Sequence, residues 1–228
     1  MGTSYNPRIV TDGLILCLDA ANKRSYPGAG TTWTDLTANK NNGTLQNMPN
    51  NFSTDGAGSL TFDGSDDYMD FYAPNLTTTT TVEMFCKIGS SYSNKMFFGW
   101  YRYDVWCGSS HLGFNTANGD VYGISSTTVN NLGLVNNWKH YIFEMRSDVS
   151  YTNNKIYIDG ILQSLGQQRG GEVSSSRSFN NGNGRIAGWL WDYQYRMPMN
   201  LALFKIYNRA LTPDEIRQNY LATKGRFQ

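Results

Sequence analysis

Short strand-like runs recur through this chain roughly every ten residues, with turn-forming pairs between them. The turn pairs are Asn42-Gly43, Asp63-Gly64, Asn118-Gly119, Asp159-Gly160 and Asn183-Gly184. Asn-Gly and Asp-Gly supply the positive φ angles that tight hairpins require. Many short strands joined by such turns predict an antiparallel sandwich or barrel, and they disfavour a fold of alternating strands and helices.

The expected strands are the runs of apolar or alternating residues that stand between these turns. They cover residues 14–19, 59–62, 81–87, 95–103, 111–114, 121–124, 139–145, 155–158, 185–188 and 201–207. Within 81–87, Val82, Met84 and Cys86 fall on one side of the strand and Glu83 and Phe85 on the other.

One helix start is clear near the end of the chain. Thr212 suits an N-cap, Pro213 suits the first helical position, and Glu215 stands where a capping box needs it. Apolar residues follow at near-helical spacing. We therefore expect one short helix over residues 213–220, with its apolar face packed on the sandwich.

Length and charge narrow the class of protein further. A chain of 228 residues fits one all-β domain, which we place at 12–228 after a flexible N-terminal arm at 1–11. The net charge of +1 gives no sign of the basic surface that nucleic-acid binding requires. No apolar run is long enough to cross a bilayer, so we expect no membrane insertion.

The cysteines and the N-terminus indicate a cytoplasmic origin. Cys17, Cys86 and Cys107 are odd in number and widely spaced, which disfavours a disulfide framework or a zinc site. We expect three partly buried thiols in strands, with one disulfide and one free thiol as the alternative. The first residues show no charged segment followed by an apolar one, so no secretory signal is expected.

Five segments in order resemble the LamG-like group of the concanavalin A-like lectin/glucanase superfamily. They are residues 59–68 (SLTFDGSDDY), 81–85 (TVEMF), 137–141 (NWKHY), 155–160 (KIYIDG) and 203–212 (LFKIYNRALT). The resemblance covers roughly residues 12–221 and implies an antiparallel jelly-roll β-sandwich with one short C-terminal helix. One fold hosts many functions, so the resemblance alone does not fix the activity.

The beginning of the chain resembles a narrower group. Residues 5–14, 18–22 and 25–28 are similar to stand-alone LamG-like proteins encoded by tailed bacteriophages. This similarity implies a non-enzymatic virion structural protein, exposed on the particle as a capsid decoration, fibre or other surface component. Other virion proteins and further copies of the chain would be its partners, and host or environmental carbohydrate a further contact. The alternative is a stand-alone carbohydrate-binding module, and a glycoside hydrolase ranks third.

The residues needed for hydrolysis are missing from the sequence. Glycosidases flank the scissile bond with two carboxylates, and glucanases of the resembled superfamily carry them in a Glu-x-Asp-x-x-Glu strand. The glutamates of this chain stand outside such a pattern: Glu83, Glu144, Glu172 and Glu215. The chain also lacks a Gly-x-Ser-x-Gly elbow, and we expect His140 to be packed in a strand. We therefore expect no enzyme activity.

Calcium is the one candidate cofactor, and none is required. Asp63, Asp66 and Asp67 form a local cluster of carboxylates, and Asp19 could approach from the first strand. Related LamG-like domains supply a further carboxylate from the closing strand, where this chain has the apolar residues 201–204. The alternative is an Asx-type turn at Asp63 with Asp66 and Asp67 solvated.

Aromatic residues gather in two segments. The first contains Trp100, Tyr101, Tyr103 and Trp106, and the second contains Trp189, Trp191, Tyr193 and Tyr195 with Asp192 among them. If the second segment is extended, its four rings share one face. Flat rings beside polar side chains suit a sugar, whose C–H face stacks on a ring while polar groups hold its hydroxyls. The rings could instead belong to the core or to a protein contact, and all three interpretations stay open.

Overall fold

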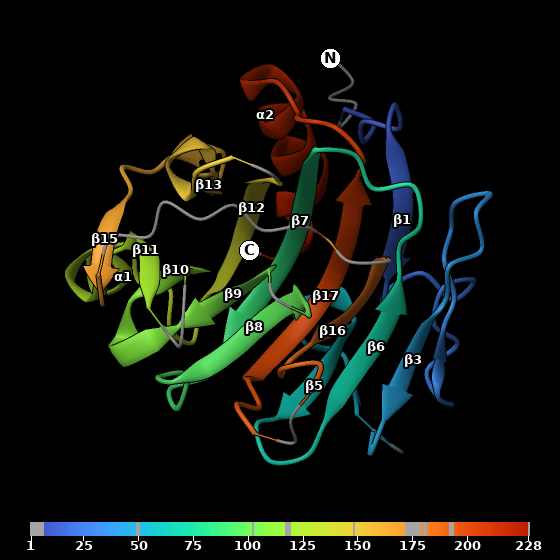
Figure 1. The fold of residues 1–228 in the computed structure, drawn as a ribbon. Coiled ribbons are helices and arrows are strands. Elements are labelled where there is room, and N and C mark those ends of the chain that lie inside the picture. The colour runs from blue at the N-terminus through green and yellow to red at the C-terminus, as the bar shows by residue number, and fades with distance from the viewer. Residues whose placement is uncertain are drawn as a thin grey trace, which may run out of the picture.

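Two antiparallel sheets face each other in the computed structural model of the chain, as Figure 1 shows. The structure describes residues 7–48, 51–101, 103–116, 120–147, 149–171, 179, 182–191 and 194–227. The expected all-β sandwich is confirmed.

The eight-stranded sheet contains the longest strands of the described chain. In spatial order it consists of β14 (Ile161–Leu162), β13 (Lys155–Ile158), β12 (Trp138–Arg146), β7 (Thr79–Ile88), β17 (Pro198–Tyr207), β5 (Ser59–Asp63) and β4 (Phe52–Ser53), with β1 (Leu14–Asp19) also paired to β17. The nine-stranded sheet consists of β15 (Gly166–Arg169), β11 (Val121–Ile124), β10 (Leu112–Asn115), β9 (Tyr103–Cys107), β8 (Lys95–Trp100), β16 (Asn183–Ile186), β6 (Tyr68–Tyr72), β3 (Gly43–Gln46) and β2 (Thr32–Trp33).

The predicted C-terminal helix is present as α2 (Pro213–Thr223). Its capping box is complete, because the Thr212 hydroxyl accepts from the Glu215 amide at 3.2 Å and the Glu215 carboxylate accepts from the Thr212 amide at 2.8 Å. A second short helix, α1 (Ser126–Asn131), was not predicted. Single 3-10 turns occupy Asp55–Ala57, Gly108–Ser110, Tyr151–Asn153 and Lys224–Arg226. Neither α-helix of the described chain is long and apolar enough to cross a bilayer.

One strand prediction and one turn prediction need correction. The run 95–103 is not one strand, because β8 ends at Trp100 and β9 begins at Tyr103, and these two residues pair across the hairpin. Asn183-Gly184 is not a turn but part of β16. A Cβ at Gly184 would lie 2.1 Å from Cζ of Phe71, so this glycine makes room for a ring on the neighbouring strand.

Aromatic side chains from both sheets interlock in the core. Phe98 of the nine-stranded sheet packs edge-on against Phe143 at 5.3 Å and Phe204 at 6.2 Å, both from the eight-stranded sheet. Val82 and Met84 of β7 point into the same interior, as their alternation predicted. The rings therefore fix the spacing between the two sheets.

The outer face of the eight-stranded sheet is also buried, because α2 covers it. Under the helix the Glu83 carboxylate accepts from Lys205 Nζ at 2.9 Å, from Asn219 Nδ2 at 2.7 Å and from His140 Nε2 at 3.1 Å. The Tyr207 hydroxyl lies 3.3 Å from Oε2 of the same carboxylate. All five side chains are buried. His140 is thus packed, as expected, and the cluster joins three strands to α2.

Part of the N-terminal arm is held by the same helix. The Val10 amide donates to Asn219 Oδ1 at 2.8 Å, and Gln218 Nε2 donates to the Arg8 carbonyl oxygen at 2.7 Å. Val10 itself is buried. The expectation of a flexible arm is therefore wrong for residues 8–10, because backbone hydrogen bonds to α2 fix them.

The three cysteines are free and buried in strands. Cys17 lies in β1, Cys86 in β7 and Cys107 in β9. The expected set of three buried thiols is confirmed, and the alternative with one disulfide is wrong.

Candidate functional site

The first aromatic segment is divided between the core and the surface of the nine-stranded sheet. Trp100 and Tyr103 are fully buried, and the Tyr103 hydroxyl donates to the Arg146 carbonyl oxygen at 2.7 Å. They belong to the core and offer no surface for a ligand, which corrects the prediction that they form a binding face. Successive residues of a strand point to opposite faces, so Trp106 instead lies on the outer face of β9.

The second aromatic segment does not extend β16. The strand ends at Ile186, residues 189–191 are irregular, and Ala187 and Tyr195 have φ angles of 59° and 62°. The condition for a shared face, an extended strand through this segment, is therefore not met in its described residues. Trp191 is 66% exposed and packs against Tyr101, with ring centroids 4.6 Å apart. Asp192 and Tyr193 lie outside the described residues.

Three of the predicted rings meet at a cavity on the outer face of β8, β9 and β10. Trp106 forms its floor together with Met96, half-buried Trp189 packs beside them, and the exposed Tyr195 ring meets Trp106 edge-on at 4.9 Å. The cavity has a volume of about 540 Å³ and is lined by Asn94, Met96, Trp106, Asn115, Arg169, Trp189 and Tyr195. It is large enough to hold part of a small polar ligand.

Polar groups stand around this aromatic floor. Asn94 Oδ1 accepts from the Ser109 amide at 3.0 Å and from Arg169 Nη1 at 3.3 Å, so the amide orients the arginine at the rim. Asn94 and Tyr195 both have positive φ angles, 55° and 62°. Non-glycine residues held in this region cost free energy, and such residues concentrate at ligand sites.

The rest of the rim is braced by hydrogen bonds within the fold. The Tyr195 carbonyl oxygen accepts from the Met96 amide at 2.8 Å, which ties the 194–197 segment to β8. Trp189 Nε1 donates to the Tyr101 carbonyl oxygen at 3.3 Å, and Arg185 Nη1 donates to the Trp189 carbonyl oxygen at 3.1 Å. The rings are thus held in place before any ligand arrives.

Sequence reasoning missed the polar half of this site. Asn94, Asn115 and Arg169 belong to three separate segments that carry no motif. Only the pairing of β15 with β11, and of β11 with β10, brings Arg169 to the same rim as the rings.

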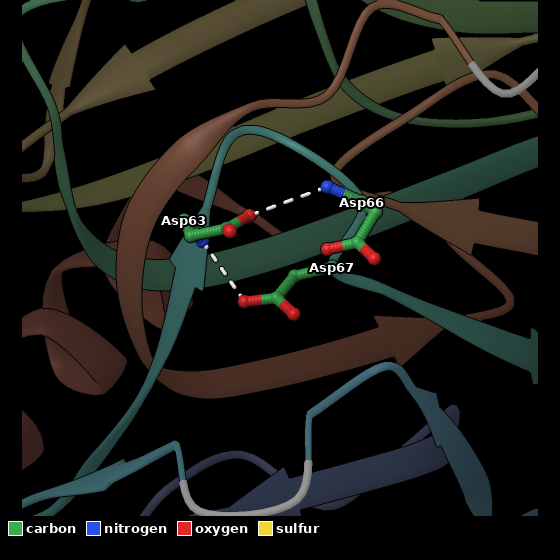
Figure 2. Close-up of side chains that lie close together, drawn as sticks. All are labelled: Asp63, Asp66 and Asp67. Atoms are coloured by element: carbon green, nitrogen blue, oxygen red, sulfur yellow. Dashed lines mark hydrogen bonds between the residues drawn. The ribbon is translucent and has the colours of Figure 1, made fainter.

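The acidic cluster lies in the turn between β5 and β6, apart from this cavity. Carboxylate oxygens of Asp63, Asp66 and Asp67 lie within 4.8 Å of one another, as Figure 2 shows. Asp19 does not join them, because its carboxylate accepts from both terminal nitrogens of Arg226 at 2.9 Å. The prediction that Asp19 completes the cluster is therefore wrong.

Hydrogen bonds within the turn use part of the cluster. Asp63 Oδ1 accepts from the Ser65 amide at 2.7 Å, which is the predicted Asx-type turn, and Asp67 Oδ2 accepts from the Asp63 amide at 3.0 Å. Asp67 is only 3% exposed, so the expectation that it is solvated is wrong. Burial raises the pKa of Asp67. Burial also acts to raise the pKa of Asp63, but amide donors from Ser65 onward outweigh it and lower that pKa.

Calcium binding at Asp63 and Asp66 stays a prediction. About 2 mM calcium is expected to raise the melting temperature by roughly 2–5 °C, given the millimolar affinities of weak extracellular sites. Differential scanning fluorimetry of the chain and of Asp66→Asn measures this, with magnesium as the ion control. An unchanged melting temperature in calcium would contradict the prediction, as would an equal rise in the variant.

Comparison with known families and structures shows what this chain is similar to. The sequence model of the concanavalin A-like lectin/glucanases superfamily, Laminin_G_3, matches residues 63–217. A comparison with curated protein sequences finds no significant match.

Solved structures share the fold at low sequence identity. Trypanosoma rangeli sialidase in complex with the inhibitor DANA has a TM-score of 0.63 at 15% identity, over 99% of this chain and 36% of that one. The receptor binding domain of botulinum neurotoxin mosaic serotype C/D has a TM-score of 0.60 at 12% identity, over 92% and 50%. The receptor binding domain of botulinum neurotoxin D has a TM-score of 0.58 at 15% identity, over 92% and 52%. The chain thus spans about half or less of each structure, and the likeness is one of fold.

Proposed function

The chain belongs to the concanavalin A-like lectin/glucanase superfamily, and from this premise we propose that it binds carbohydrate in the cavity above Trp106. The proposal rests on one observation: aromatic rings and side-chain amides line the same cavity. The rings are those of Trp106, Trp189 and Tyr195, and the amides are those of Asn94 and Asn115. A sugar presents an apolar C–H face and a polar rim. Aromatic rings and convergent polar groups that line one cavity match both features.

We propose binding without hydrolysis. None of the described residues that line the cavity is an aspartate or glutamate. A glycosidase needs one carboxyl group as acid and a second as nucleophile or base. Arg169 and the two amides can donate hydrogen bonds to a ligand but cannot replace that pair of carboxylates.

Removing the exposed ring of the cavity tests this function. Tyr195→Ala is expected to weaken binding to any glycan that the chain recognises by about tenfold or more, because a stacking surface is lost. Tyr195 is 37% exposed, so the fold should survive, and a glycan array followed by calorimetry on the hits measures the change.

Tyr72→Ala is the matched control. Tyr72 is 46% exposed on β6 and does not line the cavity above Trp106. Its removal should leave binding unchanged. A loss with Tyr72→Ala and none with Tyr195→Ala would place recognition elsewhere, and an array without hits would contradict carbohydrate binding altogether.

We also propose a virion surface as the setting of this binding. Support comes only from the N-terminal resemblance to stand-alone LamG-like phage proteins. On this proposal further copies of the chain and other virion proteins are its partners, whereas a stand-alone module would be monomeric. Mass spectrometry of purified particles tests it, since a structural component must be present there and its absence would favour the stand-alone module.

A further inference from the structure

The cavity above Trp106 holds one charged side chain among its described lining residues, that of Arg169. Arg169 ends β15 and pairs with Val121 of β11. Its side chain is exposed, and among the described residues it donates from Nη1 to Asn94 Oδ1 at 3.3 Å. The amide orients the guanidinium but carries no charge that could neutralise it.

Some other arginines of the described surface pair with carboxylates, whereas exposed Arg8, Arg24 and Arg217 form no ion pair with a described residue, so it is the place at the cavity that sets Arg169 apart. Arg185 donates to Asp70 at 2.7 Å, and Arg209 donates to Glu215 at 2.7 Å. Arg169 forms no ion pair with any carboxylate in the described part of the chain. Asp120, just before β11, lies against the backbone of Gly170 and forms no ion pair with the Arg169 side chain.

A neighbouring histidine responds to this charge. Burial lowers the pKa of His111, and the positive charge of Arg169 lowers it further. The His111 Nδ1 atom accepts from the Ser126 amide at 2.9 Å, which requires that nitrogen to be unprotonated. The charge of Arg169 therefore reaches His111, which does not itself line the cavity.

We infer that the cavity takes an acidic saccharide, whose carboxylate or sulfate pairs with Arg169 while its ring stacks on the exposed aromatic side chain. A guanidinium offers two parallel donors that match the two oxygens of such an anion. Carboxylates in the cavity would repel this ligand, and the described lining has none. The inference rests on the proposed carbohydrate binding at this cavity and adds the charge class of the sugar.

Matched pairs of glycans test the charge directly. Hyaluronan oligosaccharides are compared with their carboxyl-reduced forms, and heparin oligosaccharides with their desulfated forms, by calorimetry on the intact chain. At least one acidic member is expected to bind about tenfold or more tightly than its neutral counterpart. The two pairs separate carboxylate from sulfate as the anion. Raising the salt concentration from about 50 to about 500 mM should weaken binding of the acidic glycan and leave binding of the neutral glycan unchanged.

Variants of the arginine complete the test. Arg169→Gln is expected to abolish the preference for the acidic glycan while changing neutral binding by less than about twofold. Arg169→Lys keeps the charge but loses the paired donors, so it should retain only part of the preference. Arg24→Gln removes another exposed arginine, one that does not line the cavity, and should change nothing.

Each contradictory result has one meaning. Equal affinity for the acidic and neutral members of every pair would overturn the inference and leave carbohydrate binding intact. A preference that survives in Arg169→Gln would overturn the role of this residue. If no glycan of either class binds, the proposed function itself fails.

Discussion

Glu83→Gln is expected to lower the free energy of unfolding by about 3–5 kcal/mol. The substitution keeps the shape of the side chain and removes its charge. Lys205 Nζ, 2.9 Å away and 1% exposed in its side chain, is then left as a buried cation without its anion. An unpaired charge in the interior retains its desolvation cost and loses the attraction that offset it.

The loss extends beyond one ion pair because Glu83 connects several elements. Its carboxylate receives the Asn219 amide at 2.7 Å, and Asn219 in turn accepts from the Val10 backbone at 2.8 Å. Weakening this cluster therefore loosens both α2 and the N-terminal arm. Urea unfolding followed by tryptophan fluorescence measures the change, and the melting temperature should fall by roughly 10 °C.

Glu144→Gln provides the matched control. Glu144 is 1% exposed, but its partners Lys155 and Arg146 have side chains 42% and 39% exposed. When the carboxylate is lost these cations return to water, so the cost should stay below about 1 kcal/mol. Equal losses in the two glutamine variants would contradict a special role for the cluster under α2.

Local chemistry made much of the fold predictable. Asp159 and Gly160 both have positive φ angles, 51° and 80°, so their turn between β13 and β14 follows from the residues themselves. The capping box at Thr212 is equally local. The turn predicted at Gly184 was wrong because a glycine can make room for a neighbouring side chain as well as form a turn. Only the position of Phe71 on the next strand shows that Gly184 has the packing role.

The site was predictable only in part, since it depends on contacts between distant strands. Aromatic content marked Trp106, Trp189 and Tyr195 as candidates, but nothing in their spacing distinguished them from the buried Trp100 and Tyr103. Arg169 joins them only through strand pairing. The same limit concealed Glu83, whose partners follow it by 57 to 136 residues along the chain.

Stability should also fall in acid, and Glu83 is expected to contribute to that fall. Burial acts to raise the pKa of Glu83, but the charge of Lys205 and the hydrogen bond from His140 outweigh it and hold the pKa at about 2, below its ordinary value of 4.5. In the unfolded chain the group takes up a proton at the higher pH. The unfolded state therefore binds more protons between these values, and acid favours it.

Because the pKa of Glu83 is lowered by folding, its contribution to stability is lost at acidic pH. The stabilisation is complete above about pH 4.5 and is lost as the pH falls toward 2, with a total on the order of 3 kcal/mol. The difference in unfolding free energy between the wild type and Glu83→Gln should therefore narrow from about pH 5 to about pH 3, because the variant has no such group to protonate. Sucrose at one fixed concentration in all samples keeps the variant folded.

Glu215→Gln separates this effect from the acid response of the helix cap. Arg209 lowers the pKa of Glu215 to about 2 as well, through a hydrogen-bonded pair near the surface. Solvent screens that pair, so its removal should flatten the acid dependence less than Glu83→Gln does. If the wild type and Glu83→Gln lose stability in parallel between about pH 5 and pH 3, the Glu83 carboxylate is not the group whose protonation matters there. If Glu215→Gln loses stability in parallel with the wild type and Glu83→Gln does not, the acid-sensitive group is Glu83 in the buried cluster and not Glu215.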